Sequence, residues 1–421
     1  MRKIYSGRSG GTHSGSFEFI VNTAIAGSSG VNSFRLPFAV ATTGMSFLAE
    51  WGDGTSTYID TTNYASKRLH NYGAAANYTV KLSGYVVGFS FGKMSGSLND
   101  AAKLIEIVHW GDYKGTESIG FKDCINFTHV SAKDTPLFVE DDTCFQMFNN
   151  CSSLVAINNV ENWNTRIIGG SGGFYGMFMK CGVFESGTHP TLTPPNLTKW
   201  DTTNCDDFRF MFWEATVFNG EMFRVLNVVN NGIGMQGLEN MFNRARAFNN
   251  NGSPSIQNWI VSSAGSFVGT FLDAEAFNQP LDNWDVSNVT NMKHMFLVST
   301  PGLGAFNQPL SSWDTSNVTN MRAMFFRNQA FDQDISNWNV NSWDGAGALG
   351  DKPITSSDGL NLSTANYDAL LIAWDAYSFP SWTGSGCNFG TSTYSLGTAA
   401  ETARTSLITK LGLPFIDGGG V

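Results

Sequence analysis

The sequence of 421 residues predicts a mixed α+β, β-rich protein with three structured parts. Residues 17–85 are expected to form a β-sandwich, residues 86–344 a solenoid of stacked repeats, and residues 345–421 a helical capping module. Residues 1–16 are expected to be a flexible segment or an anchor. Three observations predict this order: short strand-like runs come first, a recurring block follows, and two amphipathic helical segments come last.

The N-terminal part has the pattern of short antiparallel strands. Residues 34–40 and 45–51 are apolar and aromatic, and residues 78–82 alternate apolar with polar side chains. Between the last two runs, Gly52–Thr55 reads as a turn. Asp53 in this turn could ligate calcium, but an Asp between two glycines more often caps its own turn, so an Asx turn is the favoured interpretation.

The central part is a repeated block. The sixteen residues from Phe277 to Met292 recur with few changes from Phe306 to Met321, and a weaker copy begins at Phe331. A Met-Phe pair, which decays to Thr-Phe once, precedes the blocks, and its Phe recurs every 25 to 34 residues. This spacing predicts coils of about 25 residues with insertions of roughly four to nine residues between constant blocks.

Each coil combines two local patterns. A second aromatic follows the Phe of the Met-Phe pair after six residues, with a small residue midway, which predicts a short helical or 3₁₀ turn. The midway residue is Ala215, Ala245 or Ala274, and Asn328 takes its place in the last copy. The Val-Thr-Asn-Met stretch alternates apolar with polar residues, which predicts a short half-buried strand. The asparagines that flank it are expected to close turns and to join coil to coil; they are Asn288, Asn291, Asn317 and Asn320.

Such an array needs caps, because one coil buries too little apolar surface to offset the conformational entropy of about 25 residues. Residues 362–374 supply a first helix, with Ser363 as its N-cap and one apolar face. A second helix begins with the capping box Thr398–Glu401 and ends between residues 410 and 412. The apolar residues of the first helix are Tyr367, Leu370, Leu371 and Trp374.

The composition argues against several kinds of partner. Only 14% of the residues are charged, the net charge is −10 and the pI is near 5.0, so nucleic acid and anionic lipid would be repelled. No run of eighteen apolar residues is present, so membrane insertion is not expected. The first residues lack the apolar stretch of a secretion signal, so Sec-type export is not expected either.

The motifs predict no cofactor, no metal and no catalytic residue. The six cysteines have no metal-like spacing and are expected to be buried free thiols, with a Cys144–Cys151 bridge left open. Gly232–Gly237 matches a dinucleotide-binding pattern without a βαβ unit, and Gly169–Gly173 matches a nucleophile motif within a run of small residues. Asp141 and Asp142 fit a solvated loop better than an acid–base pair. The tryptophans that recur at one repeat position are expected in the core and not on a sugar; they are Trp163, Trp200, Trp259, Trp284, Trp313 and Trp338.

Two segments resemble known families. The repeats between about Ile105 and Trp343, with the string Trp-Asp-Val-Ser-Asn-Val-Thr-Asn-Met, resemble the BspA-like leucine-rich-repeat family of bacterial surface proteins. Residues 30–85, with Glu50–Thr55 and the later His70-Asn71-Tyr72, resemble a PKD-type immunoglobulin-like domain. The C-terminal module is similar to the one that often follows such repeats. The resemblance implies a leucine-rich-repeat-type solenoid and an adhesive role, and similar chains occur among structural proteins of tailed phages.

These observations lead to three functional hypotheses. The first is a non-enzymatic structural and adhesion protein of a phage virion: a capsid decoration, head fibre or tail fibre that is assembled in the host cytoplasm. Its expected partners are other virion proteins and a glycan or protein of the host surface, in an oligomeric or arrayed assembly. The second is a bacterial cell-surface adhesin exported by a non-Sec route, and the third is a polysaccharide-active enzyme with a carboxylate pair in a cleft.

Ligand contacts are expected in the insertions, because insertions interrupt the coil and must project outward. The insertions are Glu185–Pro195, Arg224–Gly237 and Leu297–Leu303. The residues proposed within them are Glu185, His189, Arg224, Asn231, Thr300 and Leu303.

Overall fold

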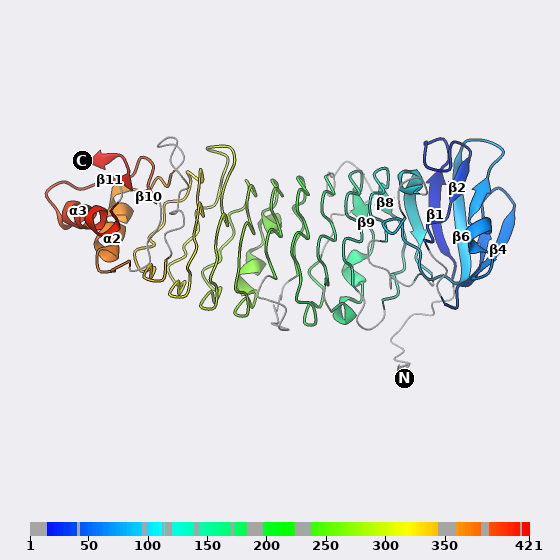
Figure 1. Cartoon of the computed structure of the whole chain (residues 1–421), viewed down its shortest axis with the longest axis horizontal. Helices are drawn as coiled ribbons and strands as arrows, with labels where there is room; N and C mark the ends of the chain where they lie inside the picture. Colours follow the sequence, from blue (N-terminus) through cyan, green and yellow to red (C-terminus); the bar gives the residue numbers. More distant parts are fainter. Residues whose placement is uncertain are drawn as a thin grey trace.

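The computed structural model of the chain shows an elongated array (Figure 1). It describes residues 15–39, 43–94, 99–111, 113, 120–138, 143–169, 172–182, 197–223, 237–343, 359–379, 387–412 and 415–421. The N-terminal strands lie at one end, coils are stacked along the middle, and helices α2 (Thr364–Trp374) and α3 (Ala399–Leu411) lie at the other end. The protein is therefore β-rich with mixed α+β content, as predicted.

The first strands form one large sheet and one small sheet. The large sheet has the order β4-β3-β6-β1-β7-β8-β9, and β2 pairs with β5 in the small sheet. Phe19 of the large sheet packs against Phe34 of the small one, with ring centroids 6.0 Å apart. The strands and the short helix beside them are β1 Phe17–Asn22, β2 Ser33–Arg35, β3 Ser46–Glu50, β4 Ser56–Asp60, α1 Tyr64–Lys67, β5 Leu69–Asn71 and β6 Asn77–Tyr85.

Two of the three predicted strands are confirmed and the third is shorter than predicted. Strands β3 and β6 cover the expected residues. Strand β2, however, ends at Arg35, because Pro37 has no N–H for a ladder, and beyond it only Phe38 forms a single bridge, to Phe89. The Gly52–Thr55 turn is present, with Gly52 and Gly54 at φ of 84° and 86°.

The large sheet crosses the expected domain boundary at residue 85. Strand β7 (Leu104–His109) pairs antiparallel with β1, and it is followed by β8 (His129–Val130) and β9 (Ala156–Ile157) in parallel pairing. The first coils of the array therefore extend the N-terminal sheet. The register between β1 and β7 shifts twice, which bends the sheet where the coils begin.

A buried polar cluster fastens this junction. Asp100 is 1% exposed and accepts hydrogen bonds from the backbone N–H groups of Ser29 and Arg35, at 2.9 and 2.8 Å. Lys103, which is fully buried, donates to the carbonyl oxygens of Gly30 and Ser33. Burial lowers the pKa of Lys103, and the neighbouring carboxylate opposes that shift. The cluster joins the loop after β1 to the 3₁₀ turn η2 (Ala101–Lys103) that leads into the array.

The predicted helical turn of each coil is confirmed and the predicted strand is not. Ala215 donates to the carbonyl of Phe212, and Phe218 donates to that of Ala215, which are successive i→i+3 bonds. In the Val-Thr-Asn-Met stretch only Asn291 and Asn320 form single parallel bridges. Backbone bonds between coils are present in this stretch, from Thr290 to Gly265 and from Met292 to Asn320, but the next N–H, that of Lys293, donates to Oδ1 of Asn291. Further 3₁₀ turns are η3 Val160–Asn162, η4 Thr165–Ile167, η5 Asn250–Gly252 and η6 Pro254–Asn258.

Aromatic columns run through the coils and form the core. The column of Met-Phe phenylalanines, extended by Phe121 before them, has ring centroids 5.4 to 5.7 Å apart from coil to coil; its members are Phe121, Phe148, Phe178, Phe212, Phe242, Phe271, Phe296 and Phe325. The second aromatic of a coil stacks on the first, as Phe242 does with Phe248 at 3.8 Å. These rings are buried, so the stacked aromatic pairs form the core of the coils.

The recurring tryptophans form a third column, and the prediction that they belong to the core is confirmed. All six are at most 3% exposed. The indole N–H of Trp284 donates to the carbonyl of Ile256 in the preceding coil at 2.9 Å, and Trp313 donates likewise to Leu281 at 3.0 Å. Trp200, Trp259 and Trp338 repeat this bond between coils. The asparagines also act as predicted, since Asn288 and Asn317 donate to the backbone of the coil before.

Both C-terminal helices form where predicted. Ser363 is the N-cap residue of α2, although its side chain makes no cap bond, and Thr398 Oγ1 caps α3 by accepting from the N–H of Ala400. Helix α3 ends at Gly412 with a φ of 68°. Two parallel strand pairs complete the module, β10 (Cys387–Asn388) with β12 (Phe415–Ile416) and β11 (Thr393–Tyr394) with β13 (Gly419–Gly420).

The six cysteines are buried free thiols, as predicted, and Cys144 and Cys151 are not bridged. Burial raises the pKa of Cys205 and of Cys387 to about 12. Among the described residues, no helix combines the length and the hydropathy that a membrane span requires.

Candidate ligand-binding surface

One face of the array is a backbone ladder that displays side chains at regular intervals. The N–H groups of Gln146, Phe148 and Asn150 donate to carbonyls of the next coil at 2.8 to 2.9 Å, and the N–H groups between them close turns within their own coil. The pattern continues through the coils up to Val298. It requires a positive φ at two positions of most coils, for example 50° at Gln146 and 61° at Asn150.

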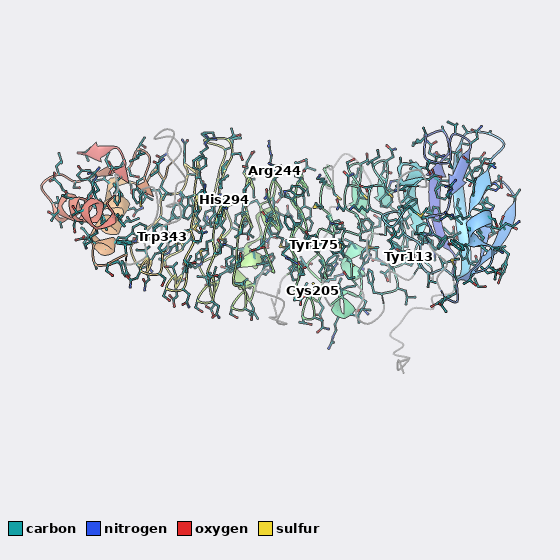
Figure 2. All side chains as sticks on the ribbon, in the orientation of Figure 1. Tyr113, Tyr175, Cys205, Arg244, His294 and Trp343 are labelled. Carbon is teal, nitrogen blue, oxygen red and sulfur yellow. The ribbon has the colours of Figure 1, made fainter. Side chains whose placement is uncertain are left out.

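Four partly buried aromatic side chains lie together on this ladder, and we call them the aromatic ridge: Phe145, Tyr175, Phe210 and Trp213. The rings of Phe145 and Tyr175 stack with centroids 5.0 Å apart and planes 17° apart. Tyr175 and Phe210 are 5.3 Å apart, and Phe210 meets Trp213 edge to face at 6.2 Å. The ridge spans three successive coils, and Figure 2 labels Tyr175 near the middle of the array.

The repeat does not require these aromatics. Phe145 and Tyr175 stand three residues before the column phenylalanine of their coils, where later coils carry Glu239, Val268 and Lys293. Phe210 stands two residues before its column phenylalanine and has a φ of 58°. Neighbouring coils place Gly176, Asn240 and Gly269 there, residues that adopt this left-handed conformation at lower cost than a bulky side chain. A strained, half-buried aromatic in place of a glycine is typical of a functional position.

Two cations flank the ridge. Arg209 pairs with Asp207 through Nε and Nη2, both at 2.9 Å, and its guanidinium lies 5.3 Å from the centre of the Tyr175 ring. The hydrogen bond to Asp207 raises the pKa of Arg209 further, so this group stays charged. Lys180 lies 5.1 Å from the centre of the Trp213 ring. The ridge therefore combines apolar ring edges with fixed positive charge on a rigid backbone.

A second exposed feature is the projecting loop, residues 299–303, which belongs to the predicted insertion Leu297–Leu303. Ser299 donates from its N–H and its hydroxyl to the two carboxylate oxygens of Asp273, which is 2% exposed. Arg327 donates to the carbonyl of Ser299 at 2.7 Å. Above this anchored base, Thr300 and Leu303 are exposed, Leu303 at 48%. Figure 1 shows the loop, in yellow, rising above the neighbouring coils.

The predicted ligand residues divide into two groups. Thr300 and Leu303 are exposed at the loop tip, where a contact residue must be. The other four, Glu185, His189, Arg224 and Asn231, lie outside the described residues. Asp141 and Asp142 also lie outside them, as do most residues of the two glycine motifs. Sequence reasoning missed the aromatic ridge, and the signal that marks it is the break in the repeat three residues before the column phenylalanine.

The Asx turn predicted at Asp53 is confirmed. Its Oδ1 accepts from the N–H and the hydroxyl of Thr55, at 3.0 and 2.6 Å, and its Oδ2 lies 2.7 Å from Nε2 of His70. Burial raises the pKa of Asp53, but the bonds from Thr55 and His70 outweigh it and lower the pKa to about 2. Both carboxylate oxygens thus have protein partners, one within the turn and one on strand β5. In the part of the chain that the structure describes, no group of three or more His, Cys, Asp or Glu side chains could hold a metal ion.

Comparison with known proteins yields one family match. The family described as "Mycoplasma protein of unknown function, DUF285" matches residues 121–254, 231–301 and 301–348, which together cover more than half of the chain. The matched region holds the aromatic columns, the ridge and the projecting loop. No curated protein and no solved structure matches the chain.

Proposed function

We propose that this chain, which belongs to the repeat-containing DUF285 family, is a non-enzymatic structural and adhesion protein whose array presents a binding face to a host surface. The aromatic ridge carries this proposal. Its side chains interrupt the repeat, are partly exposed, and lie on a face whose backbone is bonded from coil to coil. Half-exposed aromatics next to Arg on a rigid scaffold are the residues that dominate protein recognition surfaces.

The proposal includes the finer fold assignment. The coils are a leucine-rich-repeat-type solenoid of the BspA-like kind, and the N-terminal sheets are a PKD-like sandwich. The three aromatic columns and the coil-to-coil hydrogen bonds support the first assignment. The hairpin of β3 and β4 closed by Gly52–Thr55, with Trp51 stacked on His70 at 4.6 Å, supports the second.

The location that we propose is the virion of a phage, as a capsid decoration, head fibre or tail fibre, with a bacterial cell-surface adhesin as the alternative. The long array between two unlike end modules suits a spacer that is attached at one end (Figure 1). Mass spectrometry of purified particles and of washed host cells distinguishes the two locations. Finding the chain on washed cells and not in particles would select the adhesin.

The binding role is tested with the purified full-length chain and intact host cells. Tyr175→Glu places in the ridge the residue type that a later coil has at the same position, Glu239. Val268→Glu makes the same change outside the ridge, at a residue that is also partly exposed. We expect the first variant to lose cell binding and the second to keep it, with similar unfolding midpoints. Equal binding by both variants would remove the ridge from the proposal.

A further inference from the structure

A small cavity lies under the projecting loop, at the one described coil where the aromatic pair is separated by ten residues. In the three coils before it the pair is separated by six, with Ala215, Ala245 or Ala274 midway. In this coil the chain leaves the column after Phe296, runs through the loop, and returns through Gly304 and Ala305 to Phe306. The cavity is lined by the two flanking aromatic pairs and by Ala274, Val298, Gly304, Ala305 and Asn328.

Asn328 is the polar group of this cavity. It takes the midway position in the following coil and makes the same backbone bonds as the alanines, from its N–H to Phe325 and from Phe331 to its carbonyl. Its side chain is 1% exposed, and neither the amide oxygen nor the amide nitrogen has a hydrogen-bond partner among the described residues. A buried amide without a partner costs about 1–3 kcal/mol. The replacement of Ala by Asn therefore needs a partner of its own.

The surroundings show where that partner fits. An added Cβ on Gly304 would lie 2.8 Å from Oδ1 of Asn328 and 2.7 Å from a methyl of Val298, so only a glycine fits here and its backbone packs against the amide. The free space accommodates about one water molecule. The amide offers one acceptor and two donors, and a water molecule offers the complement. Phe271 and Phe296 also line the cavity, and their side chains are apolar and offer no competing hydrogen bond.

We propose that this cavity is a binding site for one internal water molecule, which the Asn328 amide holds as both donor and acceptor. In the coil of Phe296 the inserted loop stands where the three preceding coils have their midway alanine. The water and the Asn328 amide together fill the space that this alanine would occupy. The inserted loop and the asparagine at position 328 therefore act together. They allow the chain to leave the array at Ser299 while the aromatic columns continue beneath the loop. The site makes the base of the loop stiff, and the exposed Thr300 and Leu303 rest on it.

The test uses the full-length chain and two matched variants. We expect a crystal structure at a resolution that shows waters to place one within hydrogen-bond distance of both amide atoms of Asn328. Asn328→Ala places here the residue that the coils of Ala215, Ala245 and Ala274 have, so it folds, but it leaves a larger cavity without a polar group. We expect it to lose the water and to lower the thermal midpoint by about 1–3 °C. Ala245→Asn puts the same amide where the column has no gap and should lower the midpoint more.

Two results overturn the proposal. One is a wild-type structure in which the cavity holds no water. The other is an Asn328→Ala variant with a raised thermal midpoint. Such a rise would show that the amide has no hydrogen-bond partner in the wild-type chain, because removing an unpaired buried amide stabilises the fold.

Discussion

The column of tryptophans makes a quantitative prediction. Trp284 and Trp163 are equally buried, at 2% and 3% exposure, but only Trp284 donates from its indole to a carbonyl of the preceding coil. The indole nitrogen of Trp163 is buried without a hydrogen-bond partner among the described residues. Replacing either tryptophan with phenylalanine removes a similar volume from the core. The difference between the two variants therefore isolates the bond between coils.

The expected loss of stability in each variant follows from the hydrogen-bond partners of the indole N–H. The carbonyl of Ile256 also accepts from the N–H of Trp259, so losing the indole costs the net value of one bond, about 0.5–1.5 kcal/mol. The smaller ring costs about 1 kcal/mol more in packing. Trp284→Phe should then lower the free energy of unfolding by about 2 kcal/mol. Trp163→Phe has the same packing cost but removes an unpaired buried N–H, which is worth about 1–3 kcal/mol, so it should be neutral or stabilising.

The assay is equilibrium urea unfolding of the full-length chain, followed by circular dichroism, with the slope compared between variants. A gap of about 2 kcal/mol between the variants corresponds to more than a tenfold change in the unfolding equilibrium constant. Equal losses in the two variants would show that the indole bonds add nothing beyond packing, and the reasoning about the column would be refuted.

Four further predictions follow from single features. Phe210→Gly removes about 1 kcal/mol of left-handed strain and a stacking contact of similar size, so we expect little change in stability but weaker binding to host cells. Lys103→Met removes the donor to the carbonyls of Gly30 and Ser33 and the positive charge near the buried Asp100, so it should lower the free energy of unfolding by about 3 kcal/mol, measured by urea unfolding; a loss under about 1 kcal/mol would contradict the role of the cluster. The pKa of Asp53 is lowered to about 2 in the fold, from an ordinary value of 3.8, so its contribution to stability is present above about pH 4 and is lost as the pH falls toward 2; Asp53→Asn should flatten acid unfolding in that window. Burial raises the pKa of Cys205 to about 12, and all six thiols are buried, so a thiol reagent at pH 8 should label none in the native chain and six in urea.

Local signals in the sequence were enough for the end modules. Helix α3 is predicted correctly because local residues mark both of its ends. Thr398 caps the first turn with its hydroxyl, and Gly412 ends the helix with a positive φ. Strand β3 and its turn are predicted for the same reason. Strand β2 is shorter than its apolar run suggests. Whether a residue joins a sheet depends on the partner strand, and Pro37 has no N–H to donate to that strand.

Contacts between distant residues were not predictable in this way. Nothing in residues 17–22 indicates that β1 pairs with β7, about 85 residues later, and so carries the first sheet into the array. The cluster of Asp100 and Lys103 is equally hidden, since both residues look like ordinary surface charges in the sequence. The strand expected in each coil is reduced to a single bridge, and Oδ1 of Asn291 accepts from the N–H of Lys293 just after it, a competition that alternation of apolar and polar residues does not reveal.

The structure shows that aromatic residues of this chain are of two kinds, and recurrence separates them. An aromatic that returns in every coil stacks on its own copies in a buried column, so its role is to hold coil to coil. An aromatic that appears in a few coils only, such as Tyr175 or Phe210, has no copy to stack on beyond its neighbours and remains partly exposed. The same criterion selects Asn328, which stands at the midway position where three preceding coils have Ala215, Ala245 and Ala274 and the first coils have Cys124 and Cys151. In a repeat protein the residues that break the repeat are therefore the candidates for function, and neighbouring coils supply the control for each. Replacing such a residue with its counterpart from another coil keeps the backbone conformation and removes the special chemistry, so stability and binding can be separated by a single substitution.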